Sequence, residues 1–128
     1  MKVFDSSAIY KAISLGKPAQ LFDQYTSSLA FFELGNIIWK NSQLAKIYSQ
    51  KEAAEFLNIC EIVLEKMRIS YANLSDIYHL AAKYHVSFYD ASYISLAINL
   101  NCSFVTLDEK LAHKVRSDVN VVPVEDMA

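Results

Sequence analysis

Hydrophobic residues follow two alternating patterns along the chain, short apolar runs and longer stretches with a period near 3.6 residues. The chain opens with an apolar run at 2–4 that stops at Asp5, and apolar residues at helical spacing follow until Gly16 and Pro18. Short apolar runs are typical of buried strands, and the 3.6-residue period is typical of amphipathic helices. The start of the chain therefore predicts a strand that turns directly into a helix near Ser6.

The alternation continues to the end of the chain. The clearest helix is predicted at 50–67, where Ser49 and Glu52 have the spacing of a capping box. The other expected elements are a short helix at 18–24, a strand near Ser28 and Leu29, a longer helix with an apolar face of Leu34, Ile37, Ile38, Leu44 and Ile47, a strand in 68–72, helices at 76–85 and 88–99, a strand in 102–107, a helix at 109–116 and a last strand in 119–124.

Strands separated by helices predict a parallel sheet with helices on both faces. We expect a three-layer α/β/α domain whose central, mainly parallel sheet has four to five strands. Pro123 cannot donate to a sheet ladder, which favours an edge position for the last strand. At 128 residues and 14.5 kDa, the chain is expected to form a single domain over 1–128.

Composition adds few constraints on function. No apolar stretch approaches the roughly 18 residues of a membrane span, and no targeting signal is recognised, so a soluble cytoplasmic protein without membrane contact is expected. The two cysteines, Cys60 and Cys102, and three scattered histidines lack zinc-ligand spacing and are expected to provide no disulfide framework. We expect both thiols to be small core residues.

The net charge of −2 argues weakly against a nucleic-acid partner. The chain has 12 basic and 14 acidic residues. If four of the 14 acids bound metal, ten would remain against the 12 basic residues, and the rest of the chain would be mildly basic. The charge balance therefore depends on what the acidic residues do.

Four acidic residues lie where predicted strands end and predicted helices begin. Asp5 ends the first strand and Asp108 ends the strand in 102–107, whereas Glu33 and Asp90 are expected in the first turns of their helices. Ligands of open α/β sheets gather at the carboxyl ends of the strands. Carboxylates from distant parts of the chain can therefore converge there.

Helix capping explains several of the same placements, and this alternative remains open. Asp5 and Asp108 are each suitable N-caps, and Asp90 follows Ser87 at capping-box spacing. Thr106 and Glu109 have the same spacing. Capping therefore accounts for three of the four acids.

Glu33 is the acid that capping leaves unexplained. Ala30 stands three residues before it, where a capping box needs Ser or Thr. Its neighbours in sequence are apolar, and an unpaired carboxylate is costly in apolar surroundings. Glu33 therefore favours a functional role for the acidic residues.

Electrostatics predicts what would hold such carboxylates together. Two carboxylates about 4 Å apart repel by roughly 4 kcal/mol at an effective dielectric constant of about 20. A cluster survives only if it is protonated or neutralised by cations. All-oxygen ligands favour Mg²⁺, or Mn²⁺ in the same geometry, and such an ion suits phosphodiester hydrolysis because it acidifies water and stabilises charge on phosphoryl oxygens.

Four segments in order resemble the PIN-domain family, particularly the toxin ribonucleases of type II (VapBC-type) toxin–antitoxin pairs. They are "VFDSSAI", "SLAFFELGNIIWK", "SFYDASYISLA" and "FVTLDEKLA", and their order and spacing match from residue 3 to about 112. The resemblance implies a parallel sheet with the acidic site at its carboxyl ends, dependence on Mg²⁺ or Mn²⁺, and cleavage of RNA. It also implies a homodimer and an antitoxin whose C-terminal segment covers the acidic groove.

The resemblance also assigns roles to individual residues. The acidic quartet that binds metal and orients the attacking water corresponds to Asp5, Glu33, Asp90 and Asp108. Supporting roles, in orienting a carboxylate or binding phosphate, correspond to Ser7, Asn36 and Thr106. For these three, ordinary capping and local hydrogen bonding is the alternative. One departure is Ala30, where many relatives have a hydroxyl residue.

An RNA substrate would require positive charge around the acidic site. The candidate phosphate contacts are Lys11, Lys40, Lys110 and Lys114, with a solvated helix surface as the alternative for each. The sequence thus favours a metal-dependent endoribonuclease toxin. The alternatives are a PIN-type nuclease of RNA processing or decay without an antitoxin, and a non-catalytic protein-binding module whose acids only cap helices.

Overall fold

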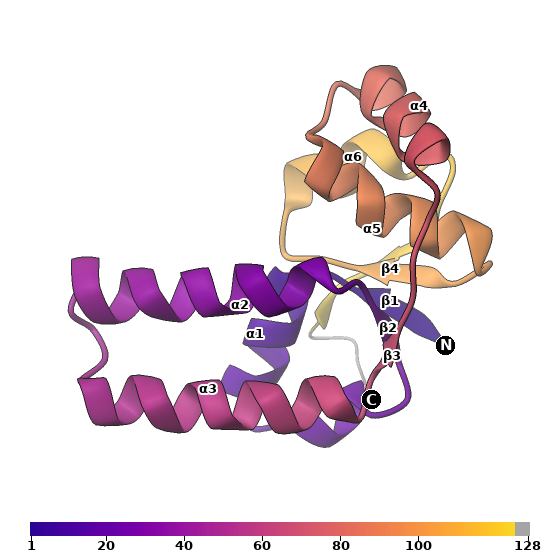
Figure 1. Ribbon diagram of the computed structural model, residues 1–128. Helices are drawn as coiled ribbons and strands as arrows, with labels where there is room; N and C mark the ends of the chain where they lie inside the picture. Colours follow the sequence, from indigo (N-terminus) through magenta and orange to yellow (C-terminus); the bar gives the residue numbers. More distant parts are fainter. Residues whose placement is uncertain (125–128) are drawn as a thin grey trace.

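A computed structural model describes residues 1–124 of the chain (Figure 1). The strands are β1 (Lys2–Phe4), β2 (Tyr25–Thr26), β3 (Arg68–Ile69), β4 (Ser103–Val105) and β5 (Val121–Val122). The α-helices are α1 (Ser6–Ser14), α2 (Leu29–Trp39), α3 (Gln50–Glu65), α4 (Leu74–Tyr84), α5 (Phe88–Asn99) and α6 (Glu109–Val115). A 3₁₀-helix covers Pro18–Leu21, and a π-helix, Lys40–Leu44, continues α2.

The five strands form one parallel sheet in the order β3-β2-β1-β4-β5. In the central pair, Val3 lies opposite Phe104 and Phe4 lies opposite Val105. The last strand is at an edge, and Pro123 follows it directly, as the sequence predicted. The predicted fold class and the number of strands are confirmed.

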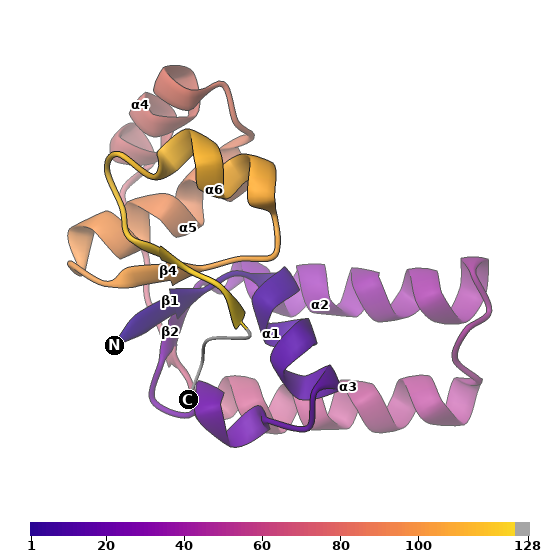
Figure 2. The same ribbon diagram turned by 180° about the vertical axis from the view of Figure 1, so that it is seen from behind.

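Successive side chains of the central strands point into two separate hydrophobic cores, one on each face of the sheet. Val3 and Phe104 pack in the core beneath α4, α5 and α6, whereas Phe4 and Val105 pack in the core beneath α1, α2 and α3. Figures 1 and 2 show these two groups of helices on opposite faces of the sheet, with α2 and α3 extending beyond it as an antiparallel pair. Because both faces are covered, the successive residues Val3–Phe4 and Phe104–Val105 of the central strands are apolar without alternation.

The second strand lies earlier than the sequence predicted. The expected strand near Ser28 and Leu29 is wrong: β2 is Tyr25–Thr26, and α2 already begins at Leu29. Ser28 has helical backbone angles, so the apolar residues after it start a helix. The Thr26 hydroxyl donates to the carbonyl oxygen of Phe4 at 2.8 Å, which ties β2 to the central strand.

Three other predicted features differ in the helices. Leu44 and Ile47 do not belong to the buried face of the long helix, because the chain switches to a π-helix at Lys40 and leaves these side chains 64% and 66% exposed. The predicted helix at 18–24 is a shorter 3₁₀-helix. The predicted helix at 76–85 begins earlier, at Leu74, because Asn73 caps it.

Local sequence signals located the other helices closely. Helix α3 has the predicted capping box, in which the Ser49 and Glu52 side chains each accept from the other residue's backbone N–H.

Within residues 1–124, no helix combines the length and the apolar character that crossing a bilayer requires. Cys60 is buried and Cys102 is half-buried, both as free thiols. The single-domain prediction remains a prediction, and its residues 125–128 lie outside the described part of the chain.

Candidate active site

Asp5 is buried between the ends of β1 and β4. It caps α1, because Oδ1 accepts from the Ala8 backbone N–H at 2.9 Å. The same oxygen accepts from the Ser7 hydroxyl at 2.7 Å, and Oδ2 accepts from the Thr106 hydroxyl at 2.5 Å. With 7% of its surface exposed, Asp5 is fixed by three donors from two elements of the fold.

Ser7 and Thr106 link Asp5 to the loop after β4. The Ser7 hydroxyl accepts from the Leu107 N–H at 3.1 Å, and the Thr106 hydroxyl accepts from the Asp108 N–H at 3.1 Å. Both hydroxyls are therefore close enough to orient Asp5, as their predicted supporting role requires. The capping-box interpretation of Thr106 and Glu109 is wrong, because Asp108 itself caps α6.

Asp90 and Asp108 line one cavity of about 220 Å³ between the starts of α5 and α6. The Asp90 N–H donates to the Ser87 hydroxyl at 3.0 Å, so Ser87 caps α5 as the sequence predicted. Asp108 Oδ1 accepts from the Leu111 N–H at 2.9 Å. Two acids from distant segments therefore share one hollow, although capping contributes to the position of each helix start.

Glu33 lies in the second turn of α2, not in the first as predicted, because the helix begins at Leu29. Its expected apolar surroundings are also partly wrong, since Phe31 and Phe32 are 46% and 78% exposed. Glu33 is half-buried, and its Oε1 accepts from the Tyr93 hydroxyl at 2.6 Å. It does not cap its helix.

Asn36 is the remaining residue with a predicted supporting role, and it lies beside Glu33. Both residues line an open hollow of about 260 Å³, together with Leu29, Phe32 and Tyr89. This places Asn36 and Glu33 on the same side of α2, as the spacing of three residues predicted. The Asn36 side chain is exposed.

The carboxylates of the quartet influence one another. Burial raises the pKa of Asp5 to about 6 against the opposing hydrogen bonds from Thr106, Ser7 and Ala8, and the charge of Asp90 adds to the rise. The pKa of Asp90 is raised as well, first by burial and then by the charges of Asp108 and Glu33. Asp90 therefore interacts through charge with each of the other three acids, in addition to the effect of burial.

This arrangement suits a divalent ion that keeps most of its water. Within residues 1–124, no group of three or more acidic, histidine or cysteine side chains is close enough to enclose a metal ion. Mg²⁺ is commonly held by only one or two carboxylates with several waters, and Asp90 and Asp108 present two carboxylates in one cavity. The donor set therefore fits a hydrated hard cation, and it does not form a closed cage.

The four predicted lysine contacts occupy different places. Lys110 and Lys114 line the same cavity as Asp90 and Asp108, and Lys114 Nζ donates to the His85 carbonyl oxygen at 3.2 Å. Lys11 is half-buried on α1. Lys40 begins the π-helix after α2, at the end of the helix pair that extends away from the sheet (Figure 1).

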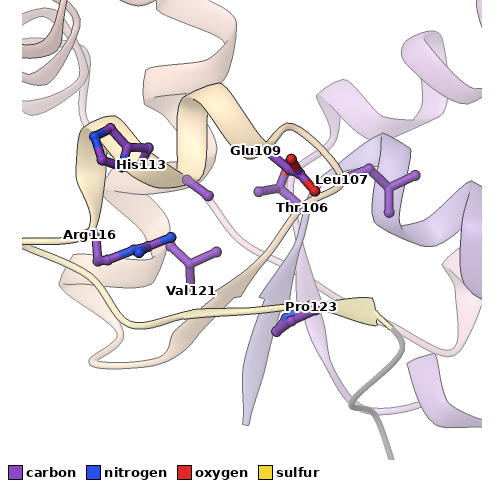
Figure 3. A pocket seen from close by; sticks show the side chains of 8 residues that line it. Thr106, Leu107, Glu109, His113, Arg116, Val121 and Pro123 are labelled. Atoms are coloured by element: carbon purple, nitrogen blue, oxygen red, sulfur yellow. The ribbon is translucent and has the colours of Figure 1, made fainter.

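A larger cavity of about 470 Å³ lies between α6 and the region of β5, and Thr106 is among the residues that line it (Figure 3). His113 and Arg116 line it from α6, and Val121 and Pro123 line it from the last strand and its end. Sequence reasoning did not single out these two basic residues. Their spacing of three on one helix face was the available signal.

Tyr93 is the contact to the quartet that sequence reasoning missed. Its side chain is only 1% exposed, so it is a core residue. Its hydroxyl nevertheless reaches a carboxylate on another helix. Burial raises the pKa of Tyr93, the Glu33 carboxylate raises it further, and the Ser6 hydroxyl acts in the opposite direction.

The parallel three-layer fold, with acids at the carboxyl edge of its sheet, defines the class of the protein as an α/β domain with an acidic edge. The chain belongs to the PIN-domain family, because the family model described as "PIN domain" matches residues 2–116. It is 33% identical over 98 residues to ribonuclease VapC3 of Pyrobaculum aerophilum, covering 75% of this chain and 74% of that protein.

A solved structure supports the same fold. The crystal structure of PAE2754 from Pyrobaculum aerophilum superposes with a TM-score of 0.82 at 23% identity, covering 97% of this chain and 89% of that one. The similarity extends over nearly the whole chain, so it includes both helical layers as well as the sheet.

The raised pKa of Asp5 predicts that the metal-free fold loses stability as pH rises. Folded Asp5 keeps its proton up to about pH 6, whereas the unfolded residue releases it near 3.8, so the folded state binds more protons between these values. The free energy of unfolding should fall by up to about 3 kcal/mol over this interval. Urea denaturation in a chelator at a series of pH values measures the loss.

Asp5→Asn should remove this part of the pH dependence, and Asp76→Asn, at an exposed acid of α4, should retain it. Parallel stability curves for the wild type and Asp5→Asn between about pH 4 and pH 7 would contradict the burial argument.

Proposed function

We propose that the chain is an endoribonuclease that hydrolyses RNA phosphodiester bonds with Mg²⁺ or Mn²⁺ as cofactor. The proposed metal-binding and catalytic residues are Asp5, Glu33, Asp90 and Asp108. The observation that carries the proposal is that Asp90 and Asp108 share one cavity at the carboxyl edge of a PIN-domain sheet, where burial, and then the charges of Asp108 and Glu33, raise the pKa of Asp90. Similarity to a protein named as a ribonuclease supports RNA as the substrate.

Each acidic residue has its own proposed role at the site. When bound, a divalent ion would make a water molecule more acidic and would neutralise charge on the phosphoryl oxygens. Asp90 and Asp108 offer carboxylate oxygens to the ion in their shared cavity. Asp5 offers a carboxylate whose orientation Ser7 and Thr106 fix. Preorganised groups of this kind reduce the reorganisation needed during the reaction.

The nuclease has two proposed biological settings, a toxin restrained by an antitoxin and an enzyme of RNA processing or decay. Similarity to a VapC protein favours the toxin. We propose that an antitoxin segment covers the acidic groove and introduces a cationic side chain among the carboxylates. A non-catalytic binding module is the alternative of another class, and the capping roles of Asp5 and Asp108 favour it.

Exposed apolar side chains predict a homodimer. Trp39 is 51% exposed and Tyr78 is 70% exposed, and α3 presents Ile59 and Ile62 at 41% and 45%. Ile59 and Ile62 are three residues apart on one face of α3, and tyrosine and tryptophan are enriched at interfaces. Sedimentation equilibrium should give about twice the chain mass of 14.5 kDa. A monomer at every concentration, unaffected by the product of any neighbouring reading frame, would argue against both the dimer and the toxin.

The lysines beside the acidic cavity predict salt-dependent RNA binding. Replacing Lys110 and Lys114 by Ala should weaken RNA binding and reduce the slope of log affinity against log salt by up to about 1.4, because each lysine neutralises at most one phosphate and a single strand gives about 0.7 per contact. Lys51→Ala is the comparison, since Lys51 is an exposed lysine of α3 that does not line this cavity. An unchanged slope in the double variant would mean that the RNA follows another path.

Asp90→Asn tests the nuclease against the binding module. The variant keeps the Ser87 cap, because the Asp90 backbone N–H makes that bond, so the fold should be retained. Replacing an outer partner of a metal site costs about 10–100-fold in affinity or activity, so loss of a direct ligand should lower RNA cleavage by at least about 100-fold. Mn²⁺ titration and cleavage of a labelled RNA measure both effects.

Asp76→Asn provides the matched control, because Asp76 is also the third residue of its helix and donates its N–H to the cap side chain. Its RNA cleavage and Mn²⁺ binding should be unchanged. If Asp90→Asn cleaves RNA as well as the wild type does, or if the wild type takes up no Mn²⁺, the binding module becomes the better explanation.

A further inference from the structure

Tyr93 connects a hydrophobic core to the acidic site. Its ring is the largest of the fully buried side chains in the described part of the chain and packs in the core beneath α4, α5 and α6. Its hydroxyl donates to Glu33 Oε1 on α2 at 2.6 Å. The two residues are 60 positions apart, and their helices, α5 and α2, cover opposite faces of the sheet (Figures 1 and 2).

The hydrogen bond from Tyr93 is the contact that holds the Glu33 carboxylate in place. Glu33 does not cap α2, and in residues 1–124 the ion pair that forms is Lys83–Asp118, which does not involve Glu33. A glutamate side chain has several rotatable bonds, whereas the Tyr93 ring is held by packing on all sides. The hydroxyl therefore has a defined position and can impose that position on the carboxylate.

We propose that Tyr93 is a positioning residue for Glu33. Its hydroxyl holds Oε1, so that Oε2 is the oxygen left for a divalent ion or an ordered water molecule. The inference rests on the proposed function, because the role of Glu33 as a metal ligand belongs to that proposal. Tyr93 does not touch substrate in this account and acts only through the carboxylate.

A purely structural role is the competing explanation. A buried hydroxyl usually finds a hydrogen-bond partner, and Glu33 could be no more than that partner. The same core holds a second buried tyrosine hydroxyl, that of Tyr84 on α4, which has no hydrogen-bond partner among the protein atoms of residues 1–124. Tyr84 packs against the same core as Tyr93, so Tyr84→Phe removes the same atom from the same layer and is a matched control.

The experiment is a double-mutant cycle on Mn²⁺ affinity, measured by calorimetry on the full chain. The variants are Tyr93→Phe, Glu33→Ala, the combination of both, and Tyr84→Phe. We expect Tyr93→Phe to weaken Mn²⁺ binding by about 10-fold, as is usual when an outer partner of a ligand is removed. It should cause no further weakening in the Glu33→Ala background, and Tyr84→Phe should bind Mn²⁺ as the wild type does.

Equal weakening by Tyr93→Phe with and without the Glu33 carboxylate would overturn the proposal, since the effect would then come from the fold. An unchanged affinity in Tyr93→Phe would overturn it as well. In cleavage assays, a positioning role should lower kcat with little change in KM, whereas damage to the RNA-binding surface should change KM.

A second measurement separates this proposal from the proposed function. The carboxyl carbon of Glu33, observed by NMR in the metal-free chain, should shift in Tyr93→Phe and stay unchanged in Tyr84→Phe. If the wild type bound no Mn²⁺, the proposed function would fail, and the NMR signal would still report whether Tyr93 orients Glu33. A Glu33 signal that ignores Tyr93→Phe would overturn the positioning role whatever the metal does.

Discussion

The parallel pairing of β1 with β4 is the constraint on which the acidic site depends. It aligns Phe4 with Val105 and is extended by a hydrogen bond of 3.2 Å from the Asp5 N–H to the Val105 carbonyl oxygen. The end of the first strand thereby lies beside the end of the fourth. From that alignment follow the short contact between Thr106 and Asp5 and the placement of Asp108 at the same edge. A slip of one residue would reverse the side chains of one strand and separate these groups.

Helix capping and the proposed chemistry use the same positions, and the physical reason is shared. A helix start offers free N–H groups and the positive end of the helix dipole, which favour a carboxylate. Asp5 and Asp108 accept from such N–H groups, and Asp90 lies in the first turn of α5. These interactions offset part of the repulsion that gathering the acids creates. Burial opposes them at Asp5, where it raises the pKa.

Several elements could be predicted because their signals are local. The starts of α3 and α5 could be predicted because each is marked by a cap, the capping box of α3 and the Ser87 cap of α5, whose residues are only three positions apart. The second strand was misplaced because β2 is only Tyr25–Thr26, too short for a periodic pattern. Its position depends on pairing with β1 and β3, which are distant in sequence. The same misplacement put Glu33 one turn too early in its helix.

The sequence by itself determined the α/β class, most helix starts and the four acids as candidates, because these follow from periodicity, capping and residue type over a few positions. Only the tertiary structure decided which hydroxyl meets which carboxylate. Thr106 and Asp5 are 101 residues apart, and Tyr93 and Glu33 are 60 apart. Such contacts depend on strand register and on helix packing across the sheet, and neither leaves a pattern in the residues that surround each partner. Tyr93 is an example, because its ring is buried in the core and its hydroxyl also donates to an acid of the candidate site.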